Sequence, residues 1–337
     1  MEYLKRTWAD ISLDNLSHNY HALRAKIPSG CRFLGVVKAD AYGHGAVPVS
    51  RYLTELGAEY LAVSNIEEAV QLRRGGIRGP ILILGYTPVT HAEDLAKMGL
   101  RQEIHSLDYA EQLNRRLEGT SLRIRVHIKL DTGMSRLGFF AYNCERTVSE
   151  LQQVAAMKHL LIEGVFTHFP VADSIDGADA NFTRTQFERF MDMLTTLKGV
   201  GIEPQIRHCC NSGASILYPE YALDMIRPGI ATYGVLPSAD LRGMIDLRPV
   251  MQLRSTIFRS AILNRTSPSA TAGPTRPPIP NASPWSASAM PTVCPAAFRA
   301  TSPSCCTANV CRRSDASAWI CAWWTSRASR RRRSATP

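Results

Sequence analysis

Lys38 is the residue whose position most directly suggests chemistry. It follows a short apolar run, residues 33–37, that has the length and the β-branched content of a strand. A lysine at the mouth of a buried strand is poorly solvated, so its pKa falls and its amine becomes a usable nucleophile for imine formation. The alternative is a lysine whose stem follows the strand end and whose charge reaches water. Gly43 and Gly45 predict a turn just beyond it.

A second basic group of residues ends a later apolar run. Alternation places His127 and Lys129 on one face of residues 124–130. Burying two basic side chains is costly unless an anion accompanies them. Two interpretations of Lys129 stay open here, a functional amine or a plain ion pair with Asp131. Arg136, in the following loop, is either a functional cation or a solvated loop arginine.

Three further apolar runs end in polar residues. His168 ends one of them, and a lone histidine at a strand end is more often structural. Asn211 and Ser212 open a predicted helix, where a hydroxyl and free backbone N–H groups bind phosphate. The alternative is an ordinary N-cap formed by either residue, and both roles are compatible. Arg227 is always protonated and only donates hydrogen bonds.

The segments that position these residues alternate in character. A helix is predicted over residues 11–26, capped by Ser12 or Asp14. Eight strand-length runs are separated by amphipathic charged segments: 33–37, 60–64, 80–85, 102–105, 124–130, 162–168, 205–209 and 224–233. This pattern predicts an α/β fold, a (β/α)8 TIM-type barrel with its chemistry at the carboxyl ends of the strands. An open doubly wound sheet is the alternative, but no GxGxxG follows the first strand.

Four motifs together resemble one family. They are VVKADAYGHG at 36–45, KLDTGMSRLG at 129–138, HCCNS at 208–212 and DMIRPGIATYG at 224–234. The chain is similar to the alanine racemases, fold-type III enzymes that use pyridoxal 5′-phosphate (PLP). The resemblance to this family extends over the chain up to about residue 258. The resemblance implies the same (β/α)8 barrel followed by a β domain.

The resemblance also implies a role for each matching residue. Lys38 would hold PLP as an imine and move the Cα proton on one face of the substrate. Arg136 would meet the substrate carboxylate and orient the second catalytic base, and Lys129 matches a lysine that many relatives carbamylate. The remaining matches imply contacts with the cofactor. His168 would pack against its ring, Arg227 would face its pyridine nitrogen, and His208 would support Arg227. Its phosphate would be bound by Tyr42, Asn211, Ser212, Gly229 and Ile230.

The implied function is interconversion of L- and D-alanine, an isomerase reaction that supplies D-alanine for peptidoglycan. The alternatives are a serine racemase of the same family or a non-catalytic single-barrel PLP-binding protein. A fold-type III decarboxylase is disfavoured by Arg227, because an arginine facing the ring nitrogen cannot give it a proton. The ring then withdraws electrons weakly, and the carbanion is reprotonated before decarboxylation competes. The expected partners are a small amino acid and, by the family pattern, a second copy of the chain in a head-to-tail homodimer.

Net charge and cysteine content limit which partners, which cellular compartment and which metal sites we expect. The formal charge of the 337 residues is +10, and residues 259–337 account for it with eleven arginines and one acid, Asp315. Residues 1–258 are neutral, so a nucleic-acid or membrane-surface partner is not expected of the barrel. No run reaches the roughly 18 apolar residues of a membrane span, and no signal peptide is evident. The nine cysteines show no zinc or disulfide spacing, so we expect a cytoplasmic protein without a metal.

The last part of the chain departs from the family. The expected organisation is a barrel over residues 1–240, the start of a β domain over 241–258, and a tail over 259–337. The tail lacks Lys, Glu, Gln, His and Tyr, and its composition predicts disorder. Codons for residues 318–324, read two bases later, admit Met-Asp-Met-Cys-Met-Val, and 286–295 admit Val-Ser-Ile-Gly-Tyr-Ala-Asp-Gly-Leu-Pro. Both match the second domain of the family, so we interpret the tail as an out-of-frame reading that lacks the catalytic tyrosine and disfavours the family dimer.

Overall fold

The computed structural model describes residues 6–261 and 283–286. The chain divides into two compact units. One unit runs from Ser12 to Val250, and the other joins the residues up to Ile11 to those from Met251 onward. The larger unit contains every residue that the sequence singled out for chemistry.

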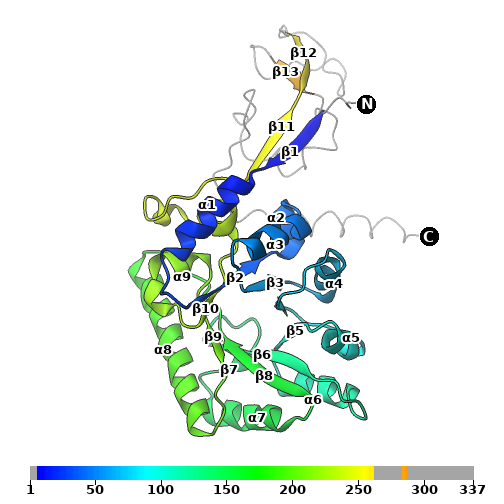
Figure 1. The fold of residues 1–337 in the computed structure, drawn as a ribbon. Helices are drawn as coiled ribbons and strands as arrows, with labels where there is room; N and C mark the ends of the chain where they lie inside the picture. The colour runs from blue at the N-terminus through cyan, green and yellow to red at the C-terminus, as the bar shows by residue number, and fades with distance from the viewer. Residues whose placement is uncertain (1–5, 262–282, 287–337) are drawn as a thin grey trace, which may run out of the picture. The chain divides into compact units, whose positions relative to one another are not determined.

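The larger unit is built on a parallel sheet that curves into a barrel (Figure 1). Its strands lie in the order β10-β2-β3-β4-β5-β6-β8-β9, with β7 (Phe139–Phe140) paired to β6. The barrel strands are β2 (Arg32–Val36), β3 (Tyr60–Val63), β4 (Ile81–Ile83), β5 (Arg101–Ile104), β6 (Ile124–Asp131), β8 (Leu160–Phe166), β9 (Ile206–His208) and β10 (Met225–Ile226). Each of the eight predicted runs supplies one of these strands.

The sheet closes between its last two strands. The Asp224 N–H donates to the Arg207 carbonyl at 3.0 Å, and the Arg227 N–H donates to the Cys210 carbonyl at 2.9 Å. On its other side β10 pairs with β2, Met225 opposite Arg32. These backbone bonds join β9 and β10 although the sheet is not continuous there. The predicted (β/α)8 TIM-type barrel is therefore confirmed.

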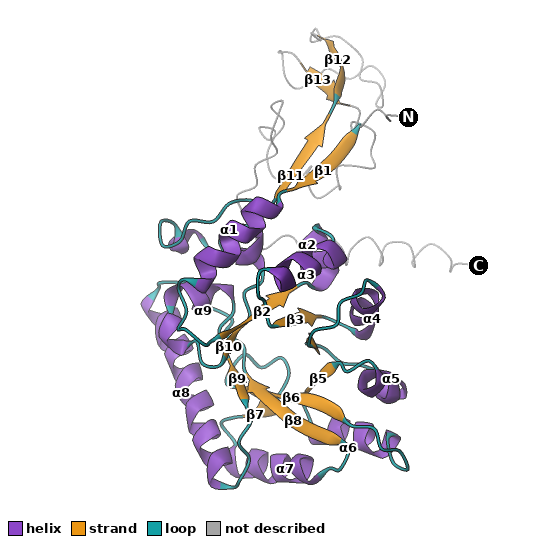
Figure 2. Cartoon of the chain, in the orientation of Figure 1, coloured by secondary structure: helices purple, strands orange, loops and turns teal. Residues whose placement is uncertain are grey.

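Helices surround the barrel strands, as Figure 2 shows in purple. They are α1 (Leu13–Arg24), α2 (Lys38–Gly43), α3 (Ala46–Glu55), α4 (Ile66–Arg74), α5 (Ala92–Lys97), α6 (Leu107–Arg116), α7 (Cys144–Ala156), α8 (Gly177–Gly199) and α9 (Ser212–Leu217). Four short 3-10 turns complete the unit: η1 (Val89–His91), η2 (Pro219–Tyr221), η3 (Ile230–Tyr233) and η4 (Ala239–Leu241). The predicted cap of the first helix is Ser12, whose hydroxyl accepts from the Asn15 N–H.

Two local predictions need correction. Residues 224–233 do not form one strand, because β10 ends at Ile226 and Ile230–Tyr233 form the 3-10 turn η3. The turn after Lys38 also begins earlier than the glycines suggested, since residues 39–42 already have φ between 52° and 55°. After Lys38 the backbone turns at residues that are not glycine, whereas after β10 Pro228 and Gly229 precede the turn η3.

The smaller unit contains two antiparallel pairs of strands. β1 (Thr7–Ile11) pairs with β11 (Met251–Ser255), and Arg254 forms an ion pair with Asp10 at 2.7 Å. β12 (Ile257–Ala261) pairs with β13 (Ser283–Ser286). The predictions of disorder and of an out-of-frame reading rest mainly on residues 262–282 and 287–337, which lie outside the described residues. The described helices include none long and apolar enough to cross a membrane.

Candidate active site

The Lys38 side chain lies at the carboxyl end of β2, half-buried. Burial lowers the pKa of its amine, and the positive charge of Arg136 lowers it further. The carboxylate of Glu68 acts in the opposite direction. The amine therefore has the property that the sequence suggested, a protonation equilibrium shifted toward the free nucleophile.

The backbone after Lys38 makes one left-handed turn. Ala39, Asp40, Ala41 and Tyr42 all occupy the left-handed region, with ψ between 34° and 51°. This conformation costs an L-residue about 1–2 kcal/mol, so four in succession need fixed contacts. The Asp40 carboxylate supplies one by accepting from the Ala46 N–H at 2.7 Å. The turn places the Tyr42 ring beside Tyr233, with ring centroids 5.1 Å apart.

Glu68 anchors the same turn, and sequence reasoning missed it. Its two carboxylate oxygens accept from the Ala39 N–H and from the Ser64 N–H, both at 2.7 Å. The side chain thus ties the residue after Lys38 to the end of the neighbouring strand β3. Its position near the start of α4 is ordinary for an acidic residue, so no local pattern distinguished it from a helix-stabilising carboxylate.

Tyr42, Ser212 and Gly229 meet in one corner of the site. A Cβ atom on Gly229 would lie 2.7 Å from the Tyr42 hydroxyl and 3.9 Å from the Ser212 hydroxyl, so only glycine permits this approach. The Ser212 hydroxyl accepts from the N–H groups of Gly229 at 2.8 Å and Ala231 at 3.3 Å. Burial raises the pKa of Tyr42 to about 12, which keeps its hydroxyl a donor. Donors thus converge on one small space, and Ile230 follows Gly229 at the start of η3.

Asn211 is occupied by the fold itself. Its side-chain oxygen accepts from the Ala214 N–H at 3.0 Å and caps α9. Its amide nitrogen donates to the Phe169 carbonyl at 2.8 Å. Of the two predicted caps, Asn211 is the one used, and its contacts hold the helix start that presents Ser212.

Arg227 lies in the barrel interior, where both terminal nitrogens of its guanidinium make hydrogen bonds. Nη1 donates to Nδ1 of His208 at 2.9 Å, and Nη2 donates to the carbonyls of Thr167 at 2.8 Å and Cys209 at 3.2 Å. Burial lowers its pKa to about 10, so it remains a cation at neutral pH. Nη2 also lies 3.4 Å from Nδ1 of His168. The predicted support of Arg227 by His208 is present as a direct contact.

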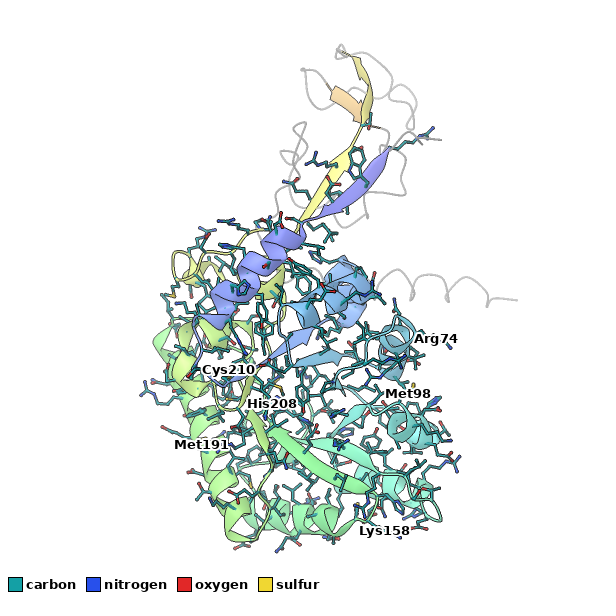
Figure 3. All side chains as sticks on the ribbon, in the orientation of Figure 1. Arg74, Met98, Lys158, Met191, His208 and Cys210 are labelled. Carbon is teal, nitrogen blue, oxygen red and sulfur yellow. The ribbon has the colours of Figure 1, made fainter. Side chains whose placement is uncertain are left out.

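The histidines beside Arg227 are neutral. Burial, and next the charge of Arg227, hold the pKa of His168 and of His208 well below the usual range. The His208 ring stacks on Phe166, with centroids 4.9 Å apart and planes inclined by 8°. In Figure 3 His208 and Cys210 lie in the barrel, whereas Arg74, Met98 and Lys158 lie at its periphery.

Lys129 is a buried amine that forms no ion pair with a carboxylate of the described residues. Burial and the charge of Arg227 lower its pKa to about 7, and its Nζ lies 4.7 Å from the centroid of the Phe166 ring. Asp131 instead accepts from the N–H groups of Gly133 and Ser135, at 2.9 and 3.0 Å. The interpretation of Lys129 as an ion pair with Asp131 is therefore wrong. An amine that is half neutral at pH 7 is chemically available.

Arg136 lies in the loop after β6, where its side chain is exposed. Its charge lowers the pKa of Lys38, of Lys129 and of His168. An influence on all three groups places the guanidinium near them, at the same end of the barrel. Lys38, Lys129, Arg136 and Arg227 also act together on His168, so the residues predicted from four separate motifs share one location.

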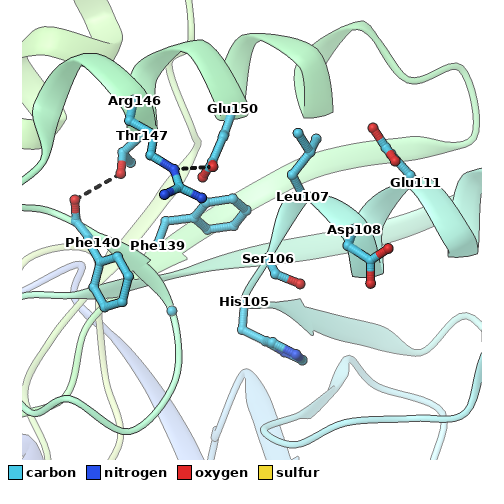
Figure 4. Close-up of a pocket in the computed structure, with 11 residues that line it drawn as sticks. His105, Ser106, Leu107, Asp108, Glu111, Phe139, Phe140, Arg146, Thr147 and Glu150 are labelled. Carbon is cyan, nitrogen blue, oxygen red and sulfur yellow. Dashed lines mark hydrogen bonds and ion pairs between the residues drawn. The ribbon is translucent and has the colours of Figure 1, made fainter.

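Figure 4 shows a separate pocket, with a volume of about 380 Å³. It is formed at the ends of β5 and β7 and by α6 and α7, and it includes none of the predicted site residues. Its wall carries an ion pair between Arg146 and Glu150 at 2.8 Å. Since the residues that line it include no lysine, the chemistry is better assigned to the residues around Lys38. The described residues contain no group of His, Cys, Asp or Glu suited to a metal ion.

A parallel (β/α)8 barrel with an activated lysine, a buried arginine and a corner of converging donors defines the class of protein. The sequence model of the alanine racemase N-terminal domain matches residues 11–237. The chain is 39% identical over 257 residues to an alanine racemase of Clostridium tetani, covering 76% of this chain. The chain therefore belongs to the alanine racemase family.

Solved structures agree with this assignment. The alanine racemase of Clostridium difficile 630 in complex with cycloserine is 36% identical and superposes with a TM-score of 0.73 over 77% of this chain. A histidine racemase of Leuconostoc mesenteroides, 24% identical with a TM-score of 0.72, shares the fold. The match spans 65% of the length of the Clostridium tetani relative.

Proposed function

We propose that this chain is a PLP-dependent amino-acid racemase whose substrate is alanine. The observation that carries the proposal is the meeting of Lys38, Arg227 and the Tyr42–Ser212–Gly229 corner at one end of the barrel. The curated relatives that match are named alanine racemases, which supports alanine as the amino acid. No feature of the described residues favours serine over alanine.

The residues present suit PLP. The Tyr42 hydroxyl, the Ser212 hydroxyl and the backbone around Gly229 and Ile230 offer donors for its phosphate, in a space that a Cβ atom on Gly229 would fill. Asn211 would act indirectly, by holding the start of α9. Lys38 would carry the aldehyde carbon, His168 would lie against the ring, and Arg227 would face the ring nitrogen. When bound, PLP stabilises negative charge that develops at the substrate Cα.

Three side chains would then have different roles in the reaction. Lys38 removes or returns the Cα proton on one face, which its lowered pKa favours. Arg136 binds the substrate carboxylate. Arg227 keeps the ring nitrogen unprotonated, because a guanidinium cannot readily give up a proton. This limits electron withdrawal, so reprotonation at Cα is favoured over loss of carbon dioxide or transamination.

Lys129 is proposed as a carbamylation site. Its pKa of about 7 leaves much of the amine neutral, and only a neutral amine adds carbon dioxide. A carbamate there would replace one of several clustered cations by an anion, beside Arg136. This satisfies the need for an anion that the sequence indicated for this face.

A second base, on the other face of Cα, is the part we propose to be missing. The family tyrosine that supplies it falls in the reinterpreted tail, outside the described residues. We infer that the chain binds PLP and racemises poorly, and that the family homodimer is weakened. Its physiological role would be D-alanine supply for peptidoglycan in the cytoplasm.

The test is chemical capture of the cofactor. Protein incubated with PLP and reduced with borohydride should carry the label on the peptide that contains Lys38, as read by mass spectrometry. Lys38→Ala should abolish the label, whereas Lys158→Ala, at an exposed lysine, should leave it unchanged. In a separate experiment with PLP-loaded protein that has not been reduced, alanine in deuterated buffer should exchange its Cα hydrogen with little inversion. Labelling elsewhere would refute the site, and efficient inversion would refute the missing base.

A further inference from the structure

A row of hydrogen bonds crosses the barrel interior and reaches well beyond the residues assigned above. Nε2 of His208 lies 2.8 Å from Nδ1 of His127, and Nε2 of His127 lies 3.2 Å from Oε2 of Glu163. With the bond from Arg227 to His208, these contacts form what we call the interior network: Arg227, His208, His127 and Glu163. It spans β10, β9, β6 and β8.

The two ends of the interior network fix the place of every proton in it. Arg227 can only donate, so Nδ1 of His208 must accept and Nε2 of His208 must carry the hydrogen. That hydrogen can go only to Nδ1 of His127, which leaves the hydrogen of His127 on Nε2. Glu163 is a carboxylate and accepts it. Both imidazoles are thus neutral Nε2–H tautomers, and all bonds point from Arg227 toward Glu163.

Glu163 is held as an anion at the far end. Burial raises the pKa of its carboxyl, but hydrogen bonds from His127 and Arg101 outweigh burial and bring it to about 2. Arg101 contacts both carboxylate oxygens, at 3.0 and 3.2 Å. Arg101 begins β5, whereas Arg227 follows the end of β10, so the interior network runs along the barrel rather than around one end.

Gly164 makes room for this arrangement. A Cβ atom on Gly164 would lie 2.5 Å from Nδ1 of His127 and 2.6 Å from Cε1, closer than packed atoms approach. The pairing of β6 with β8 also shifts by one residue between Val126 and His127. The irregular pairing and the absent side chain together seat the His127 ring against the backbone of β8.

We propose that His127 and Glu163 are positioning residues for Arg227. They hold His208 in the tautomer that accepts from the guanidinium, and so they fix the direction in which the remaining guanidinium donors point. The consequence for the reaction rests on the proposed function, in which Arg227 faces the ring nitrogen of PLP. The tautomers themselves are a property of the protein alone.

The first test reads the interior network without cofactor. In the full chain labelled with 15N-histidine, two rings should be neutral Nε2–H tautomers that do not titrate between pH 5.5 and 8. A 15N–15N scalar coupling across the hydrogen bond should join Nε2 of His208 to Nδ1 of His127, and His127→Phe should remove it. Either ring protonated, or either in the Nδ1–H form, would overturn the proposal whether or not PLP binds.

The second test uses 15N-labelled PLP, in which the chemical shift of the ring nitrogen reports whether Arg227 keeps that nitrogen unprotonated. The ring nitrogen should be unprotonated in the wild type, in Glu163→Gln, which keeps an acceptor, and in Arg101→Met. The last variant removes the ion pair with Arg101 but keeps the carboxylate on His127 and its ion pair with Arg125 at 3.3 Å. In Glu163→Leu its chemical shift should move toward the protonated value, because His127 loses its acceptor and His208 is no longer fixed as the acceptor for Nη1 of Arg227. Equal shifts in Glu163→Leu and Arg101→Met would overturn the positioning role, since the ion pair alone would then explain the effect.

Discussion

Strands β2 to β4 and strands β6 to β10 line the same barrel with different kinds of side chain. The first group contributes Leu34, Val36, Ala62 and Leu82, together with Tyr60, to a cluster of packed apolar residues that Ile206 of β9 and Met225 of β10 complete. The second group places buried basic and polar side chains inward: His127, Lys129, His208 and Arg227. Apolar burial stabilises the fold, whereas buried cations cost desolvation energy. The second group therefore shares in the apolar packing and, in addition, carries the cost of buried basic side chains.

The largest effect on stability should come from the apolar half. Leu34 is fully buried, so Leu34→Ala should lower the free energy of unfolding by about 2–5 kcal/mol, through lost transfer energy and a cavity. Urea unfolding measures it. Leu161→Ala, at a residue 37% exposed on β8, is the matched control and should cost much less. Equal losses would contradict the comparison.

An intermediate effect on stability is expected from Glu68, which anchors the backbone beside the reactive lysine. Glu68→Gln keeps one acceptor oxygen and turns the other position into a donor facing a backbone N–H. This should cost about 1–3 kcal/mol of stability. Loss of the carboxylate charge should also lower the pKa of Lys38 further, because Glu68 opposes the effect of burial.

The pKa change can be read at Lys38 itself. The rate at which trinitrobenzenesulfonate modifies the Lys38 peptide should reach its midpoint at a lower pH in Glu68→Gln than in the wild type. Glu67→Gln, at the exposed neighbouring carboxylate, should leave the midpoint in place. A midpoint that moves upward would show that Glu68 does not act on this amine.

In the cationic half, the effect on stability should have the opposite sign. The folded-state pKa of Lys129 is about 7, below that of an unfolded lysine. Below pH 7 both states are protonated and the cost of burying the cation is fully present. Between about pH 7 and 10 the unfolded state binds more protons, so stability rises with pH by up to about 1.4 kcal/mol per unit from this group.

Lys129→Met isolates that contribution. In buffer free of carbon dioxide, the variant should be more stable than the wild type at pH 6, and the difference should shrink as pH rises to 10. Urea unfolding across this range measures it, and groups common to both proteins cancel in the difference. A variant that is less stable at pH 6 would mean that Lys129 is a stabilising residue and that the two halves do not differ as described.

The barrel itself could be predicted because its signal is local. Strands such as β2, β3 and β4 are short apolar runs that alternate with amphipathic charged segments, and this pattern survives in the linear sequence. The site residues Lys38, Arg136 and Arg227 were visible for the same reason, since each follows such a run. The turn after Lys38 was misplaced because Ala39, Asp40 and Ala41 carry no glycine signal for a left-handed backbone.

Contacts between distant strands could not be predicted in this way. His127 and Glu163 meet only because β6 and β8 are neighbours with a shifted register, which no periodicity reveals. Glu68, in the helix after β3, accepts a hydrogen bond from the backbone N–H of Ala39, which follows β2. In the sequence it is an ordinary acidic residue in the first turn of a helix. Such residues are identified by what they touch in the fold.

The seam of the barrel has a consequence for its synthesis. β2 emerges early from the ribosome and pairs with β3, but the partner on its other edge is β10, which is translated only near the end of the barrel. Until then the nascent chain exposes an apolar strand edge that can associate with other molecules. Ribosome stalling before residue 226 should therefore leave chains that depend on chaperones, whereas release just beyond Val250 should not.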